Sequence, residues 1–291
     1  MSAQLSEDSR TGVAGRALRR LASDPLGGLG LFLVLLLVFC GLFGPWITPF
    51  DPFKVTVPDR FQAPNFVHLF GTDNLGRDIL SRVIAGSRIA LWVGVSTIAT
   101  ALALGLILGL IAGYGPRWLD NVLMLLFDAI YSFPTVILGL TVLTLLGPSI
   151  ATLMIVVVLV QTPAYGRLTR TATLSLKTSE FVAAIESLGA SKLRIILVHL
   201  LPNVVGPLLI VASMDIPSVV ALEAGLTYLG MGIPPPAPSW GRILQEGFSL
   251  IQTAWWIVVA GGIPLILTTL GFTFLGESLR DNLDPKLRRM L

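Results

Sequence analysis

Four long stretches of this chain carry no charged side chain, and this segregation of charge constrains the fold more than any other feature. The uncharged stretches cover 26 residues (25–50), 28 residues (89–116), 38 residues (129–166) and 30 residues (247–276). Each exceeds the roughly 20 residues that cross a bilayer as an α-helix. In hydrocarbon the backbone amides and carbonyls must pair within the segment, so such stretches become helices rather than open strands.

The composition agrees with a membrane protein, because 54% of the residues are hydrophobic and only 13% are charged. A soluble domain ordinarily has about 25% charged residues. We therefore predict an all-α integral membrane protein with six transmembrane helices, at 26–47, 89–114, 119–146, 150–165, 204–226 and 254–275. The third and fourth are separated by the turn-forming sequence Gly147-Pro148-Ser149.

The distribution of Lys and Arg predicts the orientation, since basic residues near helix ends favour the cytoplasmic side. Six spans place both termini and the segment 167–203 on one side, which then holds 14 of the 20 Lys and Arg residues. Five of the others lie in one long loop. We expect a multi-pass membrane protein, with a cytoplasmic amino tail (1–25), an uncleaved first span (26–47), an external loop (48–88), a five-helix core domain (89–291) and a cytoplasmic tail (276–291).

The chain lacks the residues of a catalytic or metal centre. It holds two histidines and one cysteine, with no spacing typical of a zinc site and no Gly-x-x-x-x-Gly-Lys-Ser/Thr phosphate loop. We therefore expect no catalytic residue, no metal site and no cofactor in this chain, and a nucleic acid is not an expected partner. Any work driven by ATP requires another chain to hydrolyse it.

The charged segment between the fourth and fifth predicted spans has the pattern of two short helices joined by a glycine turn. Apolar residues recur at helical spacing after Ser179, which can cap the first helix, and Gly189 offers the left-handed conformation that ends it. Ser191 can cap a second helix, and Pro202 stands at the start of the fifth span.

This segment resembles the cytoplasmic coupling loop of ABC-importer permeases, whose pattern is Glu-Ala-Ala, three residues, Gly, nine residues, a branched apolar residue, any residue, then Leu-Pro. Counted from Gly189, Leu201-Pro202 matches the Leu-Pro and Ala184 matches the first Ala. Three positions depart from the pattern, namely Ala183, Ile185 and His199.

Three further segments resemble the dipeptide and oligopeptide permeases of the DppC/OppC type, in order along the chain. They are Gly71-Thr72-Asp73-Asn74-Leu75-Gly76-Arg77-Asp78 with Ser81-Arg82, the stretch Glu223-Ala224-Gly225-Leu226 with Ser239-Trp240-Gly241, and the ending Gly276-Glu277-Ser278-Leu279-Arg280-Asp281-Asn282-Leu283-Asp284-Pro285. The last has Glu277 where that family has Asp. The resemblance covers the chain from the first span to its carboxyl end.

The resemblance implies a type I ABC importer permease fold and a set of partners. These are a second homologous permease, two cytoplasmic ABC ATPases that bind ATP and Mg, an extracytoplasmic peptide-binding protein, the peptide substrate and the lipid bilayer. It also implies that the ATPases contact the coupling loop and that closure of the ATPases moves the neighbouring spans as a lever. The expected coupling residues are Glu180, Phe181, Ala183, Ala184, Leu188, Gly189, Ala190, Lys192, Arg194, Leu201 and Pro202.

Three carboxylates, Asp128, Asp215 and Glu223, fall within predicted spans. A charge at the bilayer centre costs about 2.5–3.5 kcal/mol, so each should face protein or water rather than lipid. They either contact peptide along the pathway or make helix-packing or gating contacts. Leu125 stands where related permeases often have an Arg near the aspartate, which leaves Asp128 without its local partner.

The outer-loop motif also has two interpretations. Gly71, Thr72, Asp73, Gly76, Arg77 and Asp78 form either an ion-paired structural turn, which we favour, or a contact with peptide.

Two other functions remain open from the sequence. One is import of nickel or another small solute by a permease of the same family. The other is a secondary transporter that works alone. An amphipathic helix on anionic lipid would explain the charges of the central segment but not its glycine turn or its Leu-Pro register.

Overall fold

The computed structural model describes residues 24–283, and in that range all of the regular secondary structure is helical. The elements are α3 (Pro25–Ile47), the short 3₁₀ turn η1 (Val57–Asp59), α4 (Ile79–Tyr114), α5 (Arg117–Tyr131), α6 (Thr135–Leu146), α7 (Ile150–Lys177), α8 (Glu180–Ser187), α9 (Lys192–Arg194), η2 (Ile195–Leu200), α10 (Leu201–Tyr228), α11 (Trp240–Ser249) and α12 (Trp255–Leu283). The basic amino tail and the Asp284-Pro285 ending of the carboxyl-terminal motif lie outside the described residues.

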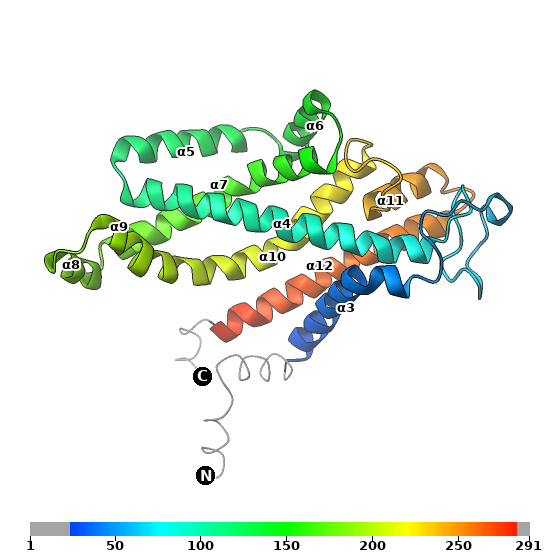
Figure 1. The fold of residues 1–291 in the computed structure, drawn as a ribbon, viewed down its shortest axis with the longest axis horizontal. Coiled ribbons are helices and arrows are strands. Elements are labelled where there is room, and N and C mark those ends of the chain that lie inside the picture. The colour runs from blue at the N-terminus through cyan, green and yellow to red at the C-terminus, as the bar shows by residue number, and fades with distance from the viewer. Residues whose placement is uncertain (1–23, 284–291) are drawn as a thin grey trace, which may run out of the picture.

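The long helices run side by side along one axis and give the molecule two distinct ends (Figure 1). The helices α8 and α9 lie at one end, here called the α8 end. The helix α11 and the loop that follows α3 lie at the other, here called the α11 end.

Five of the described helices are long and apolar enough to cross a membrane: α3, α4, α7, α12 and the continuous helix that runs from Lys192 to Tyr228. The bent pair α5 and α6 passes the same test together, which brings the number to six when it is counted as one span. The predicted all-α membrane architecture is therefore confirmed.

The third predicted span is not a single helix, contrary to expectation. Its two parts, α5 and α6, meet at an angle of 89°. The break falls at Ser132-Phe133-Pro134, where Pro134 has no amide to donate and disfavours helical geometry in the preceding residue. The prediction of an unbroken helix over 119–146 is therefore wrong.

Two other predicted boundaries also need correction. The helix α4 begins at Ile79 rather than at residue 89, because the Asp78 carboxylate caps it by accepting a hydrogen bond from the Ser81 amide at 2.8 Å. The loop after α3 is shorter accordingly. The helix α7 continues past residue 165 to Lys177, so Arg167 and Arg170 lie on a long helix rather than in a loop.

The core of the molecule is built on close contact between α4 and α7. Three glycines four residues apart on α4, Gly105, Gly109 and Gly113, face α7. A methyl group at these positions would lie 2.4 Å from the Tyr165 Cβ, 2.4 Å from the Gly166 carbonyl oxygen and 2.7 Å from the Thr173 Cβ. Small residues at this spacing let two membrane helices approach closely.

The first helix, α3, lies on the outside of the bundle. Gly27 and Gly30 contact α12, while Gly41 contacts Leu91 of α4. The large apolar side chains of α3 are mostly exposed, as expected for a helix that faces lipid.

Candidate coupling and transport sites

The helix α8 projects at the α8 end and stops at a glycine turn. Gly189 has φ +81°, the left-handed conformation that the sequence predicts for it. Ser191 caps α9, since its hydroxyl accepts a hydrogen bond from the Arg194 amide at 3.4 Å. Ser179, however, does not cap α8, because its hydroxyl instead donates to the Leu176 carbonyl.

One side of α8 is fixed to the bundle. Val182 is buried in a small apolar cluster with Leu110 of α4 and with Ile195 and Leu200 of η2. The Tyr114 hydroxyl at the end of α4 adds a hydrogen bond of 3.1 Å to the Glu186 carboxylate. This side positions the helix.

The other side of α8 presents apolar side chains to the surroundings. Phe181 is 40% exposed, Leu188 is 87% exposed and Leu193 of α9 is 66% exposed. Most of the other expected coupling residues are also exposed, namely Glu180, Ala183, Ala184, Gly189, Lys192, Arg194 and Pro202. Two of them, Ala190 and Leu201, are partly buried. We call Phe181, Leu188 and Leu193 with Lys192 and Arg194 the α8 surface.

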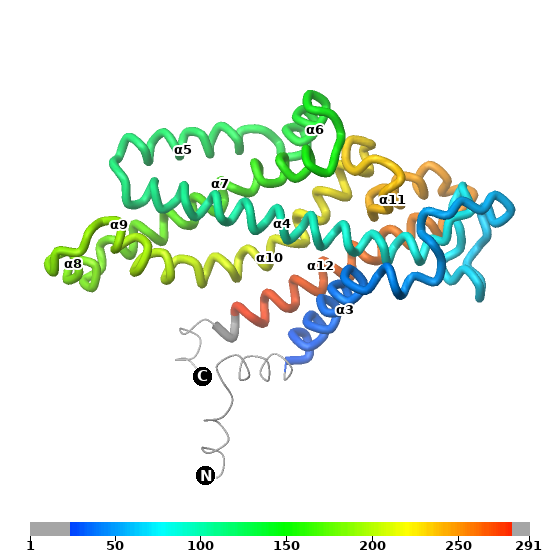
Figure 2. Tube along the Cα trace, viewed as in Figure 1, coloured from blue at the N-terminus to red at the C-terminus, as the bar shows by residue number. Residues whose placement is uncertain are grey.

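The second helix of the predicted coupling loop is not separate from the following span. The helix α9, the π-helical segment η2 and α10 follow one another without a break from Lys192 to Tyr228 (Figure 2). Pro202 lies in the first turn of α10. The α8 surface is thus joined to the full length of α10.

A set of polar side chains comes from the last turn of α5 and the middle parts of α7 and α10. The Arg167 guanidinium of α7 forms an ion pair of 2.7 Å with Asp128 of α5 and lies 4.9 Å from the centre of the Tyr131 ring. The Tyr165 hydroxyl of α7 donates a hydrogen bond of 2.8 Å to the Asp215 carboxylate of α10. We call these five residues the polar belt.

The polar belt supplies the partner that the sequence does not show for Asp128. In place of a nearby arginine on its own helix, Asp128 pairs with Arg167 across to α7. A second ion pair joins the same two helices nearer the α8 end, where Arg170 binds Asp120 with a contact of 2.6 Å between Nη2 and Oδ2. These two pairs connect α5 to α7.

Glu223, in contrast, is a buried residue of α10. It is 2% exposed, and its Oε1 accepts a hydrogen bond of 2.9 Å from the Thr227 hydroxyl, which in turn accepts one from the Ile233 amide. The structure therefore separates Glu223 from Asp128 and Asp215.

The outer-loop motif forms a buried ion network at the α11 end. Asp73 Oδ2 lies 2.7 Å from Arg77 Nε and 2.6 Å from Arg82 Nη1. Both arginines also reach Glu246 of α11, at 3.2 Å and 2.7 Å. Two carboxylates and two guanidinium groups thus neutralise one another between the loop, α4 and α11.

The rest of the motif shapes this network. Asp78 does not join the ion pair of Asp73 and Arg77, contrary to expectation, because it caps α4 and contacts His68 Nδ1 at 2.9 Å. Thr72 is buried, and its side chain accepts a hydrogen bond from the Gln62 amide. Gly71 and Gly76 have φ of +71° and +72°, and a methyl group on Gly76 would lie 1.9 Å from the Thr56 carbonyl oxygen.

The sequence did not indicate several members of these sites. Glu246 is 169 residues from Arg77 in the chain, and no motif connects them. No sequence motif singled out Tyr165, Tyr131 or Arg167. Arg167 does border the longest uncharged stretch, and a charge so close to the membrane needs a partner. In residues 24–283 we find no group of His, Cys, Asp and Glu that could hold a metal ion.

Comparisons with known proteins agree with this architecture. Residues 105–289 match the family described as binding-protein-dependent transport system inner membrane component, and residues 13–64 match the N-terminal TM domain of oligopeptide transport permease C. Similar proteins include the di/tripeptide transport system permease protein DppC of Pseudomonas aeruginosa, which is 38% identical over 89% of this chain and 88% of its own length.

Two other relatives are similar over nearly their whole length. The dipeptide transport system permease protein DppC of Alkalihalophilus pseudofirmus is 36% identical over 97% of this chain and 93% of its own length. The glutathione transport system permease protein GsiD of Escherichia coli is 37% identical over 93% of this chain and 89% of its own length. The chain is therefore a membrane subunit of an ABC importer, not an enzyme, and belongs to the binding-protein-dependent transport system inner membrane component family, in its DppC/OppC-type branch.

Proposed function

We propose that this chain passes short peptides across the bacterial inner membrane as one of two permease subunits. The α8 end faces the cytoplasm and docks on an ATPase that binds ATP and Mg, and the α11 end meets an extracytoplasmic peptide-binding protein. The second permease completes the path, and both termini of this chain are cytoplasmic. Peptide is the favoured cargo, rather than nickel, because relatives are named for dipeptide, di/tripeptide and glutathione transport.

The α8 surface is the observation that carries this proposal. Exposed Phe181 and Leu188 lie on and just after α8, whose opposite side is fixed by Val182, and the exposed cations Lys192 and Arg194 follow in α9. Exposed aromatic and aliphatic side chains next to charges are typical of anchors that enter a groove on a partner protein. Since α9, η2 and α10 are continuous, a movement of the docked ATPase would reach the polar belt through α10.

Affinity purification of the assembled transporter tests the docking. We expect Phe181→Asp with Leu188→Asp to release the ATPases while the second permease stays bound, because both side chains are exposed and only the docking contact is lost. The control Ser175→Asp adds a charge at an exposed position on α7 and should keep the ATPases. Retention of the ATPases and of peptide-stimulated ATP hydrolysis by the double variant would contradict the proposal.

The polar belt is proposed to line the path between the two permeases. Asp128 lies eleven residues after the start of α5, roughly 16 Å along the helix, which places it near the middle of a hydrocarbon core about 30 Å thick. Its side chain is 66% exposed and that of Arg167 is 39% exposed. Exposed charges at this depth face water or protein rather than lipid.

A charge exchange separates a role in the path from simple helix packing. Asp128→Arg with Arg167→Asp keeps an ion pair between α5 and α7 but reverses the charges offered to a peptide. If the belt contacts peptide termini, uptake of a labelled dipeptide into proteoliposomes with the complete transporter should stay low in the exchanged variant although its thermal stability recovers. Full recovery of uptake would show that only the ion pair matters.

A further inference from the structure

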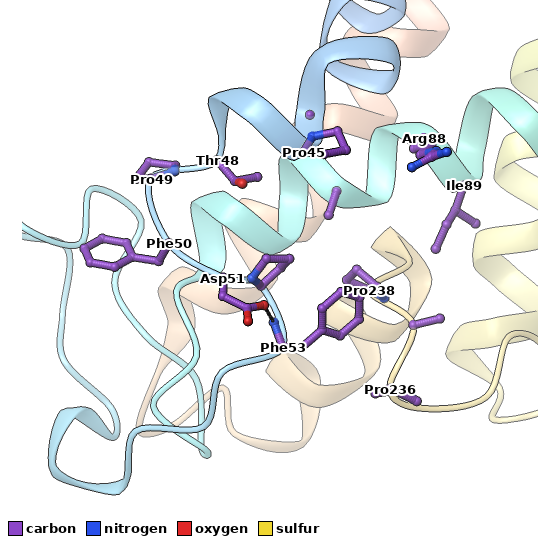
Figure 3. Close-up of a pocket in the computed structure, with 14 residues that line it drawn as sticks. Pro45, Thr48, Pro49, Phe50, Asp51, Phe53, Arg88, Ile89, Pro236 and Pro238 are labelled. Carbon is purple, nitrogen blue, oxygen red and sulfur yellow. Dashed lines mark hydrogen bonds between the residues drawn. The ribbon is translucent and has the colours of Figure 1, made fainter.

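A half-open pocket lies at the α11 end (Figure 3), and no residue of the α8 surface, the polar belt or the ion network lines it. Its volume is about 690 Å³, and it is lined by three parts of the chain: the end of α3 with its following loop (44–53), α4 at Ala85, Arg88 and Ile89, and the loop 236–238. Five lining residues are prolines, whose rings are rigid and whose nitrogens donate no hydrogen bond. The walls are therefore preformed and mainly apolar.

Arg88 gives this apolar pocket a positive charge. Its side chain is exposed, and none of the ion pairs between residues of the described range 24–283 includes it. The carboxylate in the lining, Asp51, lies well away from Arg88 in the close-up and accepts a hydrogen bond of 2.9 Å from the Phe53 amide (Figure 3). The guanidinium is thus available to an anionic group from outside the chain.

The position of Arg88 along α4 places it at the level of the lipid headgroups. It precedes Tyr114, at the opposite end of the helix, by 26 residues, or roughly 39 Å of helix. That distance exceeds the hydrocarbon thickness of about 30 Å and falls just within the 40–45 Å that includes the headgroups. Trp46, at the end of α3, is 78% exposed at the same end of the molecule, as is typical of an aromatic residue at the membrane surface.

The face beside the pocket is also suited to lipid. On α3, Leu42 is 62% exposed and Phe43 is 46% exposed, and both lead to the lining residues Gly44 and Pro45. Lipid acyl chains that cover this helix therefore lie next to the mouth of the pocket. An amphiphile with one phosphate and apolar chains matches one guanidinium in an apolar cleft.

We propose that this pocket binds a phospholipid from the leaflet at the α11 end. Its phosphate accepts hydrogen bonds from the Arg88 guanidinium, and the upper part of its acyl chain packs against Pro45, Ile89 and Pro238. The bound lipid joins α3, α4 and the loop before α11 at the membrane surface. This inference rests on the membrane-spanning fold and requires neither the peptide cargo nor the orientation proposed above.

Native mass spectrometry of the assembled transporter, titrated with phosphatidylglycerol in mild detergent, tests the site. We expect Arg88→Gln to weaken the tightest lipid binding about tenfold, because a charge-assisted hydrogen bond is lost. Ala237→Trp, which fills the pocket but keeps Arg88, should weaken it as well. The matched control Lys54→Gln removes an exposed positive charge from the same loop, outside the lining, and should leave binding unchanged.

Equal lipid binding by the wild type and both pocket variants would overturn the proposal, as would an equal loss in Lys54→Gln. A photoreactive amino acid in place of Ala237 gives a second measurement that does not depend on affinity. A phospholipid adduct at that position supports the proposal. An adduct with the binding protein or the second permease would overturn it and would identify the pocket as a protein contact.

Discussion

At the α11 end three buried charged side chains and the partly buried Glu246 pair with one another, whereas at the α8 end large apolar side chains lie exposed. Asp73 and Arg82 are each 1% exposed as side chains, while Leu188 is 87% exposed. Buried, mutually neutralised charges hold a loop in one arrangement, because any other arrangement leaves a charge without a partner. Exposed apolar residues instead gain stability only when another surface covers them. The ion network at the α11 end is thus complete within the chain, whereas the α8 surface needs a partner to cover it.

The largest loss of stability is expected from breaking the ion network at the α11 end. Asp73→Ala leaves two guanidinium groups with only Glu246, so the free energy of unfolding should fall by about 3–5 kcal/mol. In detergent, this loss corresponds to a thermal midpoint lower by about 10 °C. Glu186→Ala, at the α8 end, removes one exposed hydrogen bond and should change the midpoint by no more than a few degrees. Similar midpoints for the two variants would remove the contrast between the ends.

A smaller loss of stability is expected when alanine replaces either of two glycines that have a left-handed backbone conformation. An alanine side chain at Gly76 would meet the Thr56 carbonyl oxygen at 1.9 Å, whereas at Gly189 it would meet nothing within 4 Å. Gly189→Ala should therefore cost only the conformational strain, about 1 kcal/mol. Gly76→Ala should cost at least twice as much, since the loop backbone must also move. Thermal unfolding in detergent measures both, and equal losses would show that the outer loop yields as easily as the coupling turn.

The ion pairs between α5 and α7 should contribute less to the free energy of unfolding. The side chains of Arg170 and Asp120 are 30% and 17% exposed, against 39% and 66% for Arg167 and Asp128. Arg170→Gln should lower the free energy of unfolding by about 1 kcal/mol, and Arg167→Gln by less. Double-mutant cycles with Asp120→Asn and Asp128→Asn would measure each pair separately. A larger coupling energy for the Asp128 pair would contradict this order.

The smallest effect on stability is expected from the cations of the α8 surface. Lys192→Gln and Arg194→Gln should leave the thermal midpoint unchanged, because both side chains are exposed. They should instead slow ATPase association a few-fold at low salt, as expected for charges at the rim of an interface. The difference from wild type should disappear at high salt. A salt-independent loss would mean that these side chains make buried contacts in the complex.

The helical membrane fold could be predicted because a bilayer imposes one length and one hydrogen-bonding pattern on apolar segments. The coupling turn was equally accessible, since Gly189 and Ser191 act through local backbone geometry. The 89° break before α6 was not predicted, because hydropathy averages over Pro134. The pairing of Asp73 and Arg82 with Glu246 depends on contact between distant segments, for which a single sequence contains no local signal.

The segment η2 gives the junction between the α8 surface and α10 a tolerance for one change in chain length. Its six residues, Ile195–Leu200, follow a π-helical path, with wider turns than those of an α-helix. A π-helical hydrogen bond spans five residues instead of four, so a π-helical turn holds one residue more than an α-helical turn. A one-residue deletion within Ile195–Leu200 that restored regular helix would therefore leave the direction of α8 relative to α10 nearly unchanged. The same deletion in the regular part of α10 would turn α8 about the helix axis by about 100° and would redirect the docking face.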